Sequence, residues 1–295
     1  MRNTFSVPAL CLSLLLLAAC SPEQDLVIPP ADQSEEISLN LPSQDAGIAT
    51  HDKIQFSGFT WFVRKSGYSG PGLNMFSNRM SNVWVDSQGN LHLKLTYFKG
   101  NWYCAEVYSE NFFGYGTYTF KLASRVDTLD KNVVVGLFTW NNNSFQSDAN
   151  SEVDIEFARW GNGASSTLQY SVQPSGWQNF QERFHYPSNY TQTGNFTTHT
   201  FTWKQNEVKF DSYHGHGNPT PWPAGNWSFD NTMGSRRKTE GGRTSDLVNV
   251  PRPGTSTRVH MNIWLYDANR DGFGDPPSDG QEVEVVIHSF EFTPI

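Results

Sequence analysis

Cysteine is scarce in this sequence: the 295 residues contain three cysteines, Cys11, Cys20 and Cys104. Cys104 is the one cysteine after residue 20, so no disulfide can form within the rest of the chain. The folded domain must then be held together by its hydrophobic core, and Cys104 is predicted to be a small buried residue.

Basic residues are also in the minority, because 21 Lys and Arg stand against 29 Asp and Glu, a formal net charge of −8. The basic surface that binds phosphate backbones is therefore missing, and we expect no nucleic acid partner. Long apolar segments are missing as well, since the run from Ala9 to Ala19 is too short to span a bilayer. Aromatic residues are abundant at 14%, and they suit both a β-sandwich core and the stacking of sugar rings.

Residues 1–19 have the pattern of an export signal, with Arg2 followed by the apolar run. The sequence Leu17-Ala18-Ala19-Cys20 resembles the lipobox of bacterial lipoproteins. This resemblance implies that the thiol of Cys20 is the lipid attachment point, and that the protein is anchored in the cell envelope, at the outer membrane or cell surface of a bacterium. A plain secretory signal with an incidental cysteine is the alternative.

Residues 20–51 are rich in Pro, Ser, Gln and acidic residues and show no hydrophobic period, which predicts a flexible tether. Residues 52–295 then form one domain. No segment of it shows a sustained helical period, and strands are expected at 91–95, 118–122, 133–140, 152–157, 167–173, 199–203, 208–213, 259–266 and 282–292. Many strands separated by short turns predict an all-β sandwich or jelly roll. Residues 214–255 are full of Gly, Pro and Asn and are expected to form a long loop, either a functional lid or disordered.

One predicted strand carries an unusual set of acids, because Glu152, Asp154 and Glu156 alternate with Val153, Ile155 and Phe157. Residues i, i+2 and i+4 of a strand share one face, so the outer two acids have Cα atoms ~13 Å apart with Asp154 between them. Such crowding should raise the pKa of at least one carboxyl, which could then act as an acid near neutral pH. An exposed strand with a polar outer face is the alternative, although no Lys or Arg alternates with the acids.

The segment Glu152-Val153-Asp154-Ile155-Glu156-Phe157 resembles the Glu-x-Asp-x-Glu signature of glycoside hydrolase family sixteen, and most closely that of the bacterial lichenases. Other segments match the family in the same order. They are Tyr103-Cys104-Ala105-Glu106, Gly114-Tyr115-Gly116-Thr117-Tyr118, Phe201-Thr202-Trp203 and Met261-Asn262-Ile263-Trp264.

This resemblance implies a jelly-roll β-sandwich of two antiparallel sheets with a concave substrate cleft, and endo-acting hydrolysis of a β-linked polysaccharide with retention, most often a β-glucan. It implies that Glu152 is the nucleophile, Glu156 the general acid/base and Asp154 the residue between them that modulates their ionisation. No cofactor is required, and a monomer is expected. The positions that match the family's substrate contacts are Trp140, Phe138, Glu106, Asn262, Trp264, Gln173 and Asn74.

The sequence departs from the lichenase pattern in two places. Tyr108 stands where lichenases have an Arg, and Ser171 and Gln173 stand where they have Asn and Tyr. Both departures concern sugar contacts and leave the acids intact, so the resemblance supports catalysis and puts mixed-linkage β-glucan specificity in doubt. A surface glycan-binding protein without catalysis and a transglycosylase on the same fold are the alternatives.

Metal binding has weaker support. Asp267, Asn269 and Asp271 precede Gly272 as in a calcium loop, but Ser278 stands where a bidentate acid belongs, so a structural Ca²⁺ and a simple solvated turn both remain open. His214-Gly215-His216 has no neighbouring Cys or Glu and is expected to belong to the long loop. No metal is therefore expected at the catalytic site.

Overall fold

The computed structural model describes residues 48–142, 151–165, 167–173, 184–187, 190–217, 220–231, 239–240, 243–244 and 250–295. The predicted signal segment and Cys20, as well as the tether up to residue 47, lie outside the described residues. Backbone hydrogen bonds already join Ala49 to Met80 and His51 to Asn78, so the folded part begins a few residues before Asp52. Among the described residues, none belongs to a helix long and apolar enough to cross a membrane.

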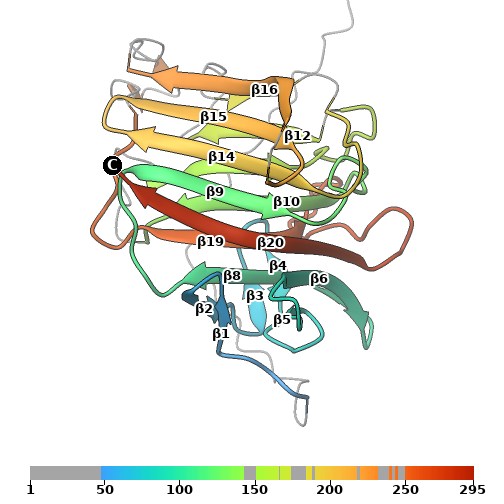
Figure 1. The fold of residues 1–295 in the computed structure, drawn as a ribbon. Helices are drawn as coiled ribbons and strands as arrows, with labels where there is room; N and C mark the ends of the chain where they lie inside the picture. The colour runs from blue at the N-terminus through green and yellow to red at the C-terminus, as the bar shows by residue number, and fades with distance from the viewer. Residues whose placement is uncertain are drawn as a thin grey trace, which may run out of the picture.

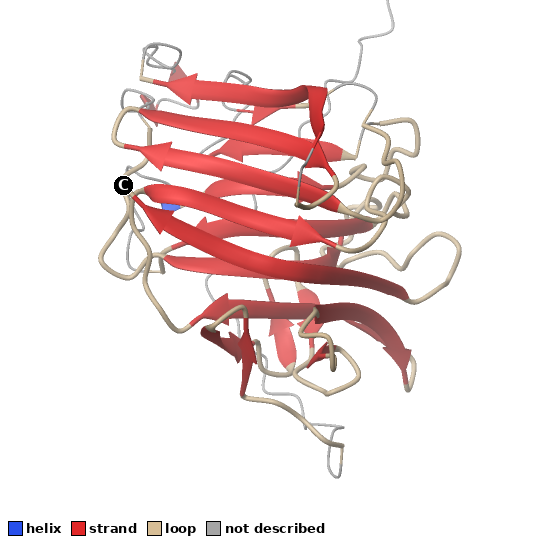
Figure 2. Cartoon of the chain, viewed as in Figure 1, coloured by secondary structure: helices blue, strands red, loops and turns tan. Residues whose placement is uncertain are grey.

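Two large antiparallel sheets face each other and form the body of the protein (Figures 1 and 2). The first, called here the site sheet, has the strand order β1 (Lys53–Phe56), β2 (Phe59–Val63), β8 (Ala105–Ser109), β19 (Arg258–Leu265), β10 (Val133–Trp140), β11 (Val153–Phe157), β12 (Leu168–Val172) and β13 (Phe184–His185). The second, called the back sheet, has the order β16 (Thr220–Asp230), β15 (Glu207–His214), β14 (Thr197–Lys204), β9 (Gly116–Leu122), β20 (Val283–Pro294), β6 (Leu91–Phe98) and β5 (Val83–Val85), with β7 (Asn101–Tyr103) paired to β6. Two short hairpins complete the described strands, β3 (Gly67–Ser69) with β4 (Asn74–Phe76) and β17 (Thr239–Glu240) with β18 (Arg243–Thr244).

The hydrophobic core lies between the two sheets. On β11 the apolar residues Val153, Ile155 and Phe157 are fully buried in this core, as the alternation of the sequence predicts. The back sheet contributes Trp203, whose Nε1–H donates to the carbonyl of Pro251 at 2.9 Å. Because successive side chains of a strand point to opposite faces, the three acids of β11 must face away from the back sheet.

The nine predicted strands are confirmed, with ends that differ by a few residues, and β10 has the predicted bounds. The hairpin at Gln205-Asn206 joins β14 to β15 through the pair Lys204 and Glu207. The prediction of one long loop over residues 214–255 was wrong, because β16 lies within it and pairs with β15. Strand β16 is at the edge of the back sheet, where proline is tolerated because one side of the strand has no hydrogen-bonding partner.

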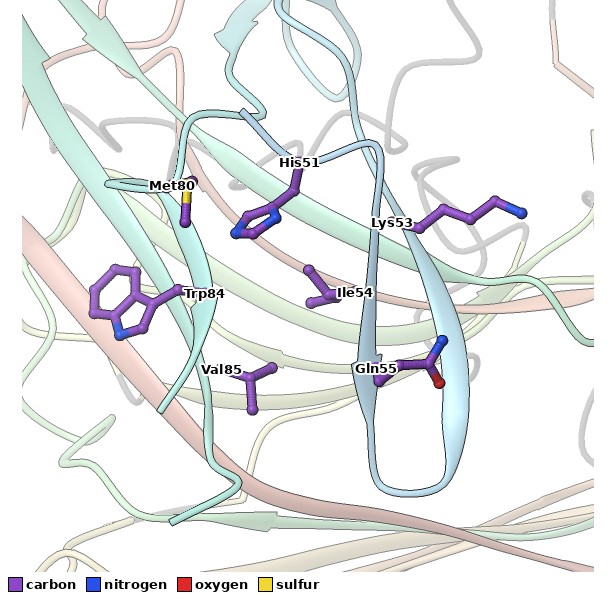
Figure 3. A pocket seen from close by; sticks show the side chains of 7 residues that line it. All are labelled: His51, Lys53, Ile54, Gln55, Met80, Trp84 and Val85. Carbon is purple, nitrogen blue, oxygen red and sulfur yellow. The ribbon is translucent and has the colours of Figure 1, made fainter. Parts of the chain in front are cut away.

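A small pocket of about 290 Å³ lies between β1 and the region around β5 (Figure 3). Its wall includes the side chains of His51, Ile54, Met80 and Trp84. Strand β1 is at the opposite end of the site sheet from the acids, with β2, β8, β19 and β10 between β1 and β11. This pocket is therefore separate from the acidic strand.

Candidate active site

The acids of β11 lie on the outer face of the site sheet. Glu152 directly precedes β11, while Asp154 and Glu156 lie within it, opposite Phe138 and Gly136 of β10. Although they face outward, Glu152 is 6% and Asp154 is 3% exposed, and Glu156 is partly buried. The acids therefore lie at the bottom of the surface that their neighbours form, and do not make up a solvated polar face.

Three side chains in β12 or directly after it donate hydrogen bonds to two of the acids. Ser171 Oγ donates to Asp154 Oδ2 at 2.8 Å, and Gln173 Nε2 donates to the same oxygen at 3.2 Å. Gln169 Nε2 donates to Glu156 Oε2 at 2.8 Å. Ser171 and Gln173, two of the three residues that depart from the lichenase pattern, thus hold Asp154 in place, so the expectation that these departures concern only sugar contacts was wrong.

The pKa values of all three carboxyls are raised, as the crowding in the sequence predicts. Burial is the largest cause for each of them. The charge of Asp154 raises the pKa of Glu152 and of Glu156 further, whereas donors from β12 limit the rise for Asp154, whose pKa is about 7. The cluster therefore retains protons close to neutral pH, which a general acid requires.

The neighbouring strands β10 and β19 bring the predicted aromatic and amide contacts to the same face. The register pairs Phe138 with Asp154 and places Trp140 two residues further along β10. Gly136 lies between Glu156 and Asn262, and its N–H donates to Asn262 Oδ1 at 3.1 Å. A Cβ atom at position 136 would lie 2.6 Å from that oxygen, so only glycine allows Asn262 this position beside Glu156.

Glu106 on β8 is buried at the centre of a charged cluster. Its Oε1 accepts hydrogen bonds from Arg64 Nη2 and His260 Nδ1, both at 2.8 Å, and Asn262 Nδ2 lies 3.4 Å from its Oε2. Burial alone would raise the pKa of Glu106, but Arg64 and His260 lower it to about 2. Glu106 is therefore ionised, and Arg64 supplies a guanidinium although Tyr108 has replaced the arginine of the lichenase pattern.

Four rings form a continuous stack across the site sheet and end beside the acids. The ring of Phe62 stacks on Tyr108 at 5.2 Å, Tyr108 on His260 at 5.4 Å, and His260 on Phe138 at 5.0 Å between centroids. These residues come from β2, β8, β19 and β10, and the register continues the row to Asp154. Because the faces of the inner rings cover one another, only their edges remain for a ligand.

Trp264 and Asn74 lie near one another at the C-terminal end of strand β19. Trp264 is 7% exposed and its ring lies 6.2 Å from that of Trp160. The side-chain amide of Asn74 donates to the carbonyls of Pro71, Gly72 and Leu265 at 2.7–2.9 Å. Its oxygen accepts from the thiol of Cys104, which is buried as predicted. Asn74 thus has a structural role, and its contact with sugar stays a prediction.

No group of three or more His, Cys, Asp or Glu residues that could hold a metal is found in the part of the chain that the structure describes. In the predicted calcium loop, both carboxylate oxygens of Asp267 accept backbone N–H groups, from Asp271 and Gly272, and Asn269 Oδ1 accepts one from Asp271. These hydrogen bonds close the turn and leave each oxygen a second acceptor site, so a structural Ca²⁺ in this loop stays a prediction. Of the two histidines at 214–216, His216 bonds to the carbonyl of Leu122, and His214 ends strand β15 although it was expected in the long loop.

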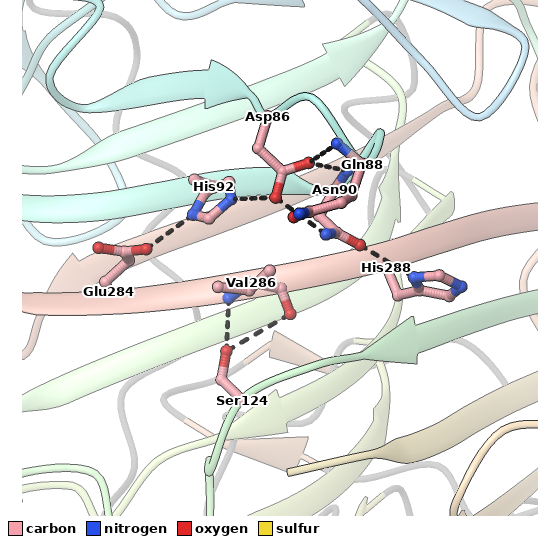
Figure 4. A network of polar contacts seen from close by, with 8 residues as sticks. All are labelled: Asp86, Gln88, Asn90, His92, Ser124, Glu284, Val286 and His288. Atoms are coloured by element: carbon pink, nitrogen blue, oxygen red, sulfur yellow. Dashed lines mark hydrogen bonds and ion pairs between the residues drawn. The ribbon is translucent and has the colours of Figure 1, made fainter.

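A second polar cluster lies on the back sheet, away from the acids (Figure 4). His92 bridges Asp86 and Glu284, with ring nitrogens 3.1 and 2.7 Å from their oxygens. Asp86 also accepts hydrogen bonds from Gln88 and Asn90, which close the turn before β6. This cluster ties β5, β6 and β20 together and is structural.

Four residues of the face were not predicted from the sequence, namely Arg64, His260, Gln169 and Trp160. His260 and Gln169 could have been found, because His260 is two positions from the predicted contact Asn262 and Gln169 is four positions from the predicted contact Gln173, so each shares a face with one. Arg64 and Trp160 follow β2 and β11, and no periodicity marks them.

Comparisons with known proteins agree with this architecture. No family model matches the chain. A β-glucanase of Paenibacillus macerans is 27% identical over 211 residues, which are 71% of this chain and 73% of that protein.

Two solved structures are similar in fold. A glycosyl hydrolase family 16 protein from Mycobacterium smegmatis has a TM-score of 0.51 at 17% identity, covering 82% of this chain and 92% of its own. A pseudo β-1,3-glucanase of Mycobacterium tuberculosis has a TM-score of 0.53 at 19% identity, covering 80% and 91%. The chain is thus an all-β sandwich with the jelly-roll fold of the β-glucanases.

Proposed function

We propose that this protein is an endo-acting glycoside hydrolase that cleaves a β-linked glucan by double displacement. The observation that carries the proposal is the row of three carboxyls on the outer face of the site sheet, two buried and one partly buried, with raised pKa values and no cation bonded to them among the described residues. A lectin gains nothing from such a row, because buried like charges oppose folding. The similarity to the β-glucanase of Paenibacillus macerans supports the substrate class.

In this mechanism Glu152 attacks the anomeric carbon while Glu156 protonates the leaving oxygen, and water then releases the sugar with Glu156 as base. Burial and the charge of Asp154 raise the pKa of Glu156, which keeps its proton available for the first step. Glu152 must be ionised to attack, and its pKa is raised as well. The hydrogen bond between Glu152 and Asp154 raises the pKa of Glu152 and lowers that of Asp154, so it favours the proton on Glu152. The attack therefore requires this proton to move to Asp154, whose pKa is also raised, to about 7.

The first test is the release of reducing ends by the purified protein from mixed-linkage β-glucan, laminarin, xyloglucan and galactans. We expect cleavage of a β-glucan, loss of cleavage in Glu152→Gln, and a β-configured first product by NMR. Binding of the same polymers without any shortening would overturn the proposal. It would favour the non-catalytic alternative, a glycan-binding protein. The fold similarity to a pseudo β-1,3-glucanase is a reason to test this alternative.

The two glutamates can be assigned by azide rescue. In Glu152→Gly, azide should occupy the place of the nucleophile and give the α-glycosyl azide from an activated substrate. In Glu156→Gly, azide should intercept the glycosyl-enzyme and give the β-glycosyl azide. The opposite pattern would exchange the two roles. Treatment with EDTA should leave turnover unchanged, because no step of this mechanism uses a metal.

The anchoring at Cys20 is proposed on the Leu17-Ala18-Ala19-Cys20 pattern alone. In a bacterial host the protein should fractionate with membranes, and Cys20→Ser should release it to the soluble fraction of the envelope. A monomer is proposed for the released form. Recovery of the native protein in the soluble fraction would favour a plain secretory signal.

A further inference from the structure

The turn after β11 holds a tryptophan in an unfavourable backbone conformation. Trp160 has a φ of 50°, in the left-handed region that bulky side chains avoid, and Gly161 follows at 76°. The turn is held by the N–H of Gly161, which donates to the carbonyl of Lys131 at 2.8 Å. Arg159, next to Trp160, donates from Nη2 to the carbonyl of Asp127 at 2.8 Å. The surrounding structure therefore offsets the strain of this turn.

This conformation brings the indole of Trp160 back toward the face of the site sheet. Its ring lies 6.2 Å from that of Trp264 and 5.4 Å from that of Tyr266. Its Nε1–H donates to Gln169 Oε1 at 2.9 Å, and Gln169 Nε2 donates to Glu156 Oε2 at 2.8 Å. Two hydrogen bonds thus connect the strained tryptophan to the proposed general acid/base.

The indole determines which end of the Gln169 side chain faces Glu156. An indole N–H can only donate, so it binds the amide oxygen and directs the NH₂ group to the carboxyl. Gln169 is only 3% exposed, so water has little access to its side chain. Without the indole, the amide could rotate and present its oxygen to Glu156 instead.

We propose that Trp160 is a positioning residue for the acid/base step: through Gln169 it fixes Glu156 Oε2 and leaves Oε1 to face the glycosidic oxygen. This inference rests on the proposed hydrolase function and on the role of Glu156 in it. The strain at Trp160 is then explained, because only the left-handed turn places the indole within reach of Gln169.

The groups around Glu156 decide what the loss of this contact does. Asp154 on the same strand raises the pKa of Glu156 by its charge, and Glu156 in turn raises the pKa of Glu152. Burial and the charge of Glu156 raise the pKa of Tyr186, which follows β13. On the other side the facing positions are Gly136 and Asn262, which carry no charge. Gln169 is thus the donor that favours the ionised form of Glu156, and its loss or rotation should raise the pKa of Glu156.

The test is the pH dependence of kcat/KM for Trp160→Phe on the polysaccharide that the native protein cleaves. Phenylalanine keeps a ring beside Tyr266 and removes only the N–H. A net hydrogen bond of ordinary strength corresponds to about half to one pH unit, so the basic limb should move up by that amount. We also expect a fall in kcat on the polysaccharide and a much smaller fall on an aryl glycoside whose leaving group needs no protonation.

Two further variants separate positioning from general damage. Tyr266 contacts the same indole, and the variant Tyr266→Phe should leave the basic limb of the pH profile in place. Gln169→Ala should reproduce the shift of Trp160→Phe, and the double variant Trp160→Phe/Gln169→Ala should add nothing to Gln169→Ala, because both act through one contact. If Trp160→Phe does not fold, Gln169→Ala alone still reports the shift.

An unmoved basic limb in Trp160→Phe and Gln169→Ala, or additive effects in the double variant, would overturn the inference while the native protein remains an active hydrolase. A native protein without activity on any glycan would overturn the proposed function, and the positioning role with it. The two failures are therefore distinguishable.

Discussion

Replacing Asp154 by Asn should make the protein more stable, and increasingly so as the pH rises. The pKa of Asp154 is about 7 in the fold against 3.8 for the ordinary side chain, so ionisation opposes folding. A raised folded-state pKa means that stability is fully present below about pH 3.8 and is lost as the pH rises toward 7. At 1.36 kcal/mol for each unit of pKa difference, the whole loss is at most about 4 kcal/mol, of which about 2–3 kcal/mol develops between pH 5 and 8.

Asparagine suits the position, because its side-chain oxygen can accept from Ser171 and Gln173 as Oδ2 of Asp154 does. Its NH₂ group would then face Glu152, which removes the like-charge contact. The gain is an upper bound, since Glu152 and Glu156 ionise more readily once Asp154 is neutral.

The assay is thermal unfolding of the native protein and Asp154→Asn at pH 5 and pH 8. For a domain of this size, 1 kcal/mol moves Tm by about 2–4 °C, so the gap between the two proteins should widen by about 5–10 °C from pH 5 to pH 8. Activity should be lost at both pH values. A gap that stays constant or narrows toward pH 8 would refute the reasoning, because Asp154 would then not have a raised pKa in the fold.

Three further substitutions test the supporting structure. Glu106→Gln should cost roughly 3 kcal/mol at pH 7 in a urea titration, because it removes the buried ion pair with Arg64, and the difference from the native protein should shrink as the pH falls from 4.5 toward 2. Gly136→Ala should cost about 1–3 kcal/mol and reduce kcat/KM, because the new Cβ displaces Asn262; unchanged kinetics would contradict this. Asn74→Ala should lower Tm through the loss of its three amide hydrogen bonds and leave KM nearly unchanged, whereas a raised KM at native Tm would make it a sugar contact.

The strands predicted best from the sequence lie in the interior of a sheet, with a neighbouring strand on both sides. Strand β10, between β19 and β11, has the predicted bounds because its apolar residues run without interruption between turn signals. Among the strands that were missed, β2 and β8 have five residues each, as many as β11, and several others are short or irregular. β3, β4 and β5 have three residues each, too few for a period of two to be recognised, and β16 contains two prolines and a glycine that indicate a loop.

The candidate site was predictable where one strand carries it and not where several strands meet. The shared face of the three acids follows from their spacing alone. The cluster around Glu106 does not, because Arg64 and His260 are 42 and 154 residues away in the chain and only the pairing of β2, β8 and β19 brings them together. Pairing of distant strands depends on the register of the whole sheet, which one sequence does not reveal.

The contrast between Glu106 and Glu156 explains how one face can hold ionised and protonated carboxyls together. Both are on the outer face of the site sheet, and burial raises the pKa of both. Glu106 has Arg64 and His260 as partners, which reverse the effect of burial. Arg159, the cation nearest to Glu156 in sequence, donates instead to the carbonyls of Asp127 and Gly163.

Because Arg159 is turned away, no described cation bonds to Glu156, and its proton is retained. The positions of Arg64 and Arg159 therefore matter more than the number of acids. Arg64 keeps Glu106 ionised, and the absence of a contact from Arg159 lets Glu156 keep a proton that it can transfer.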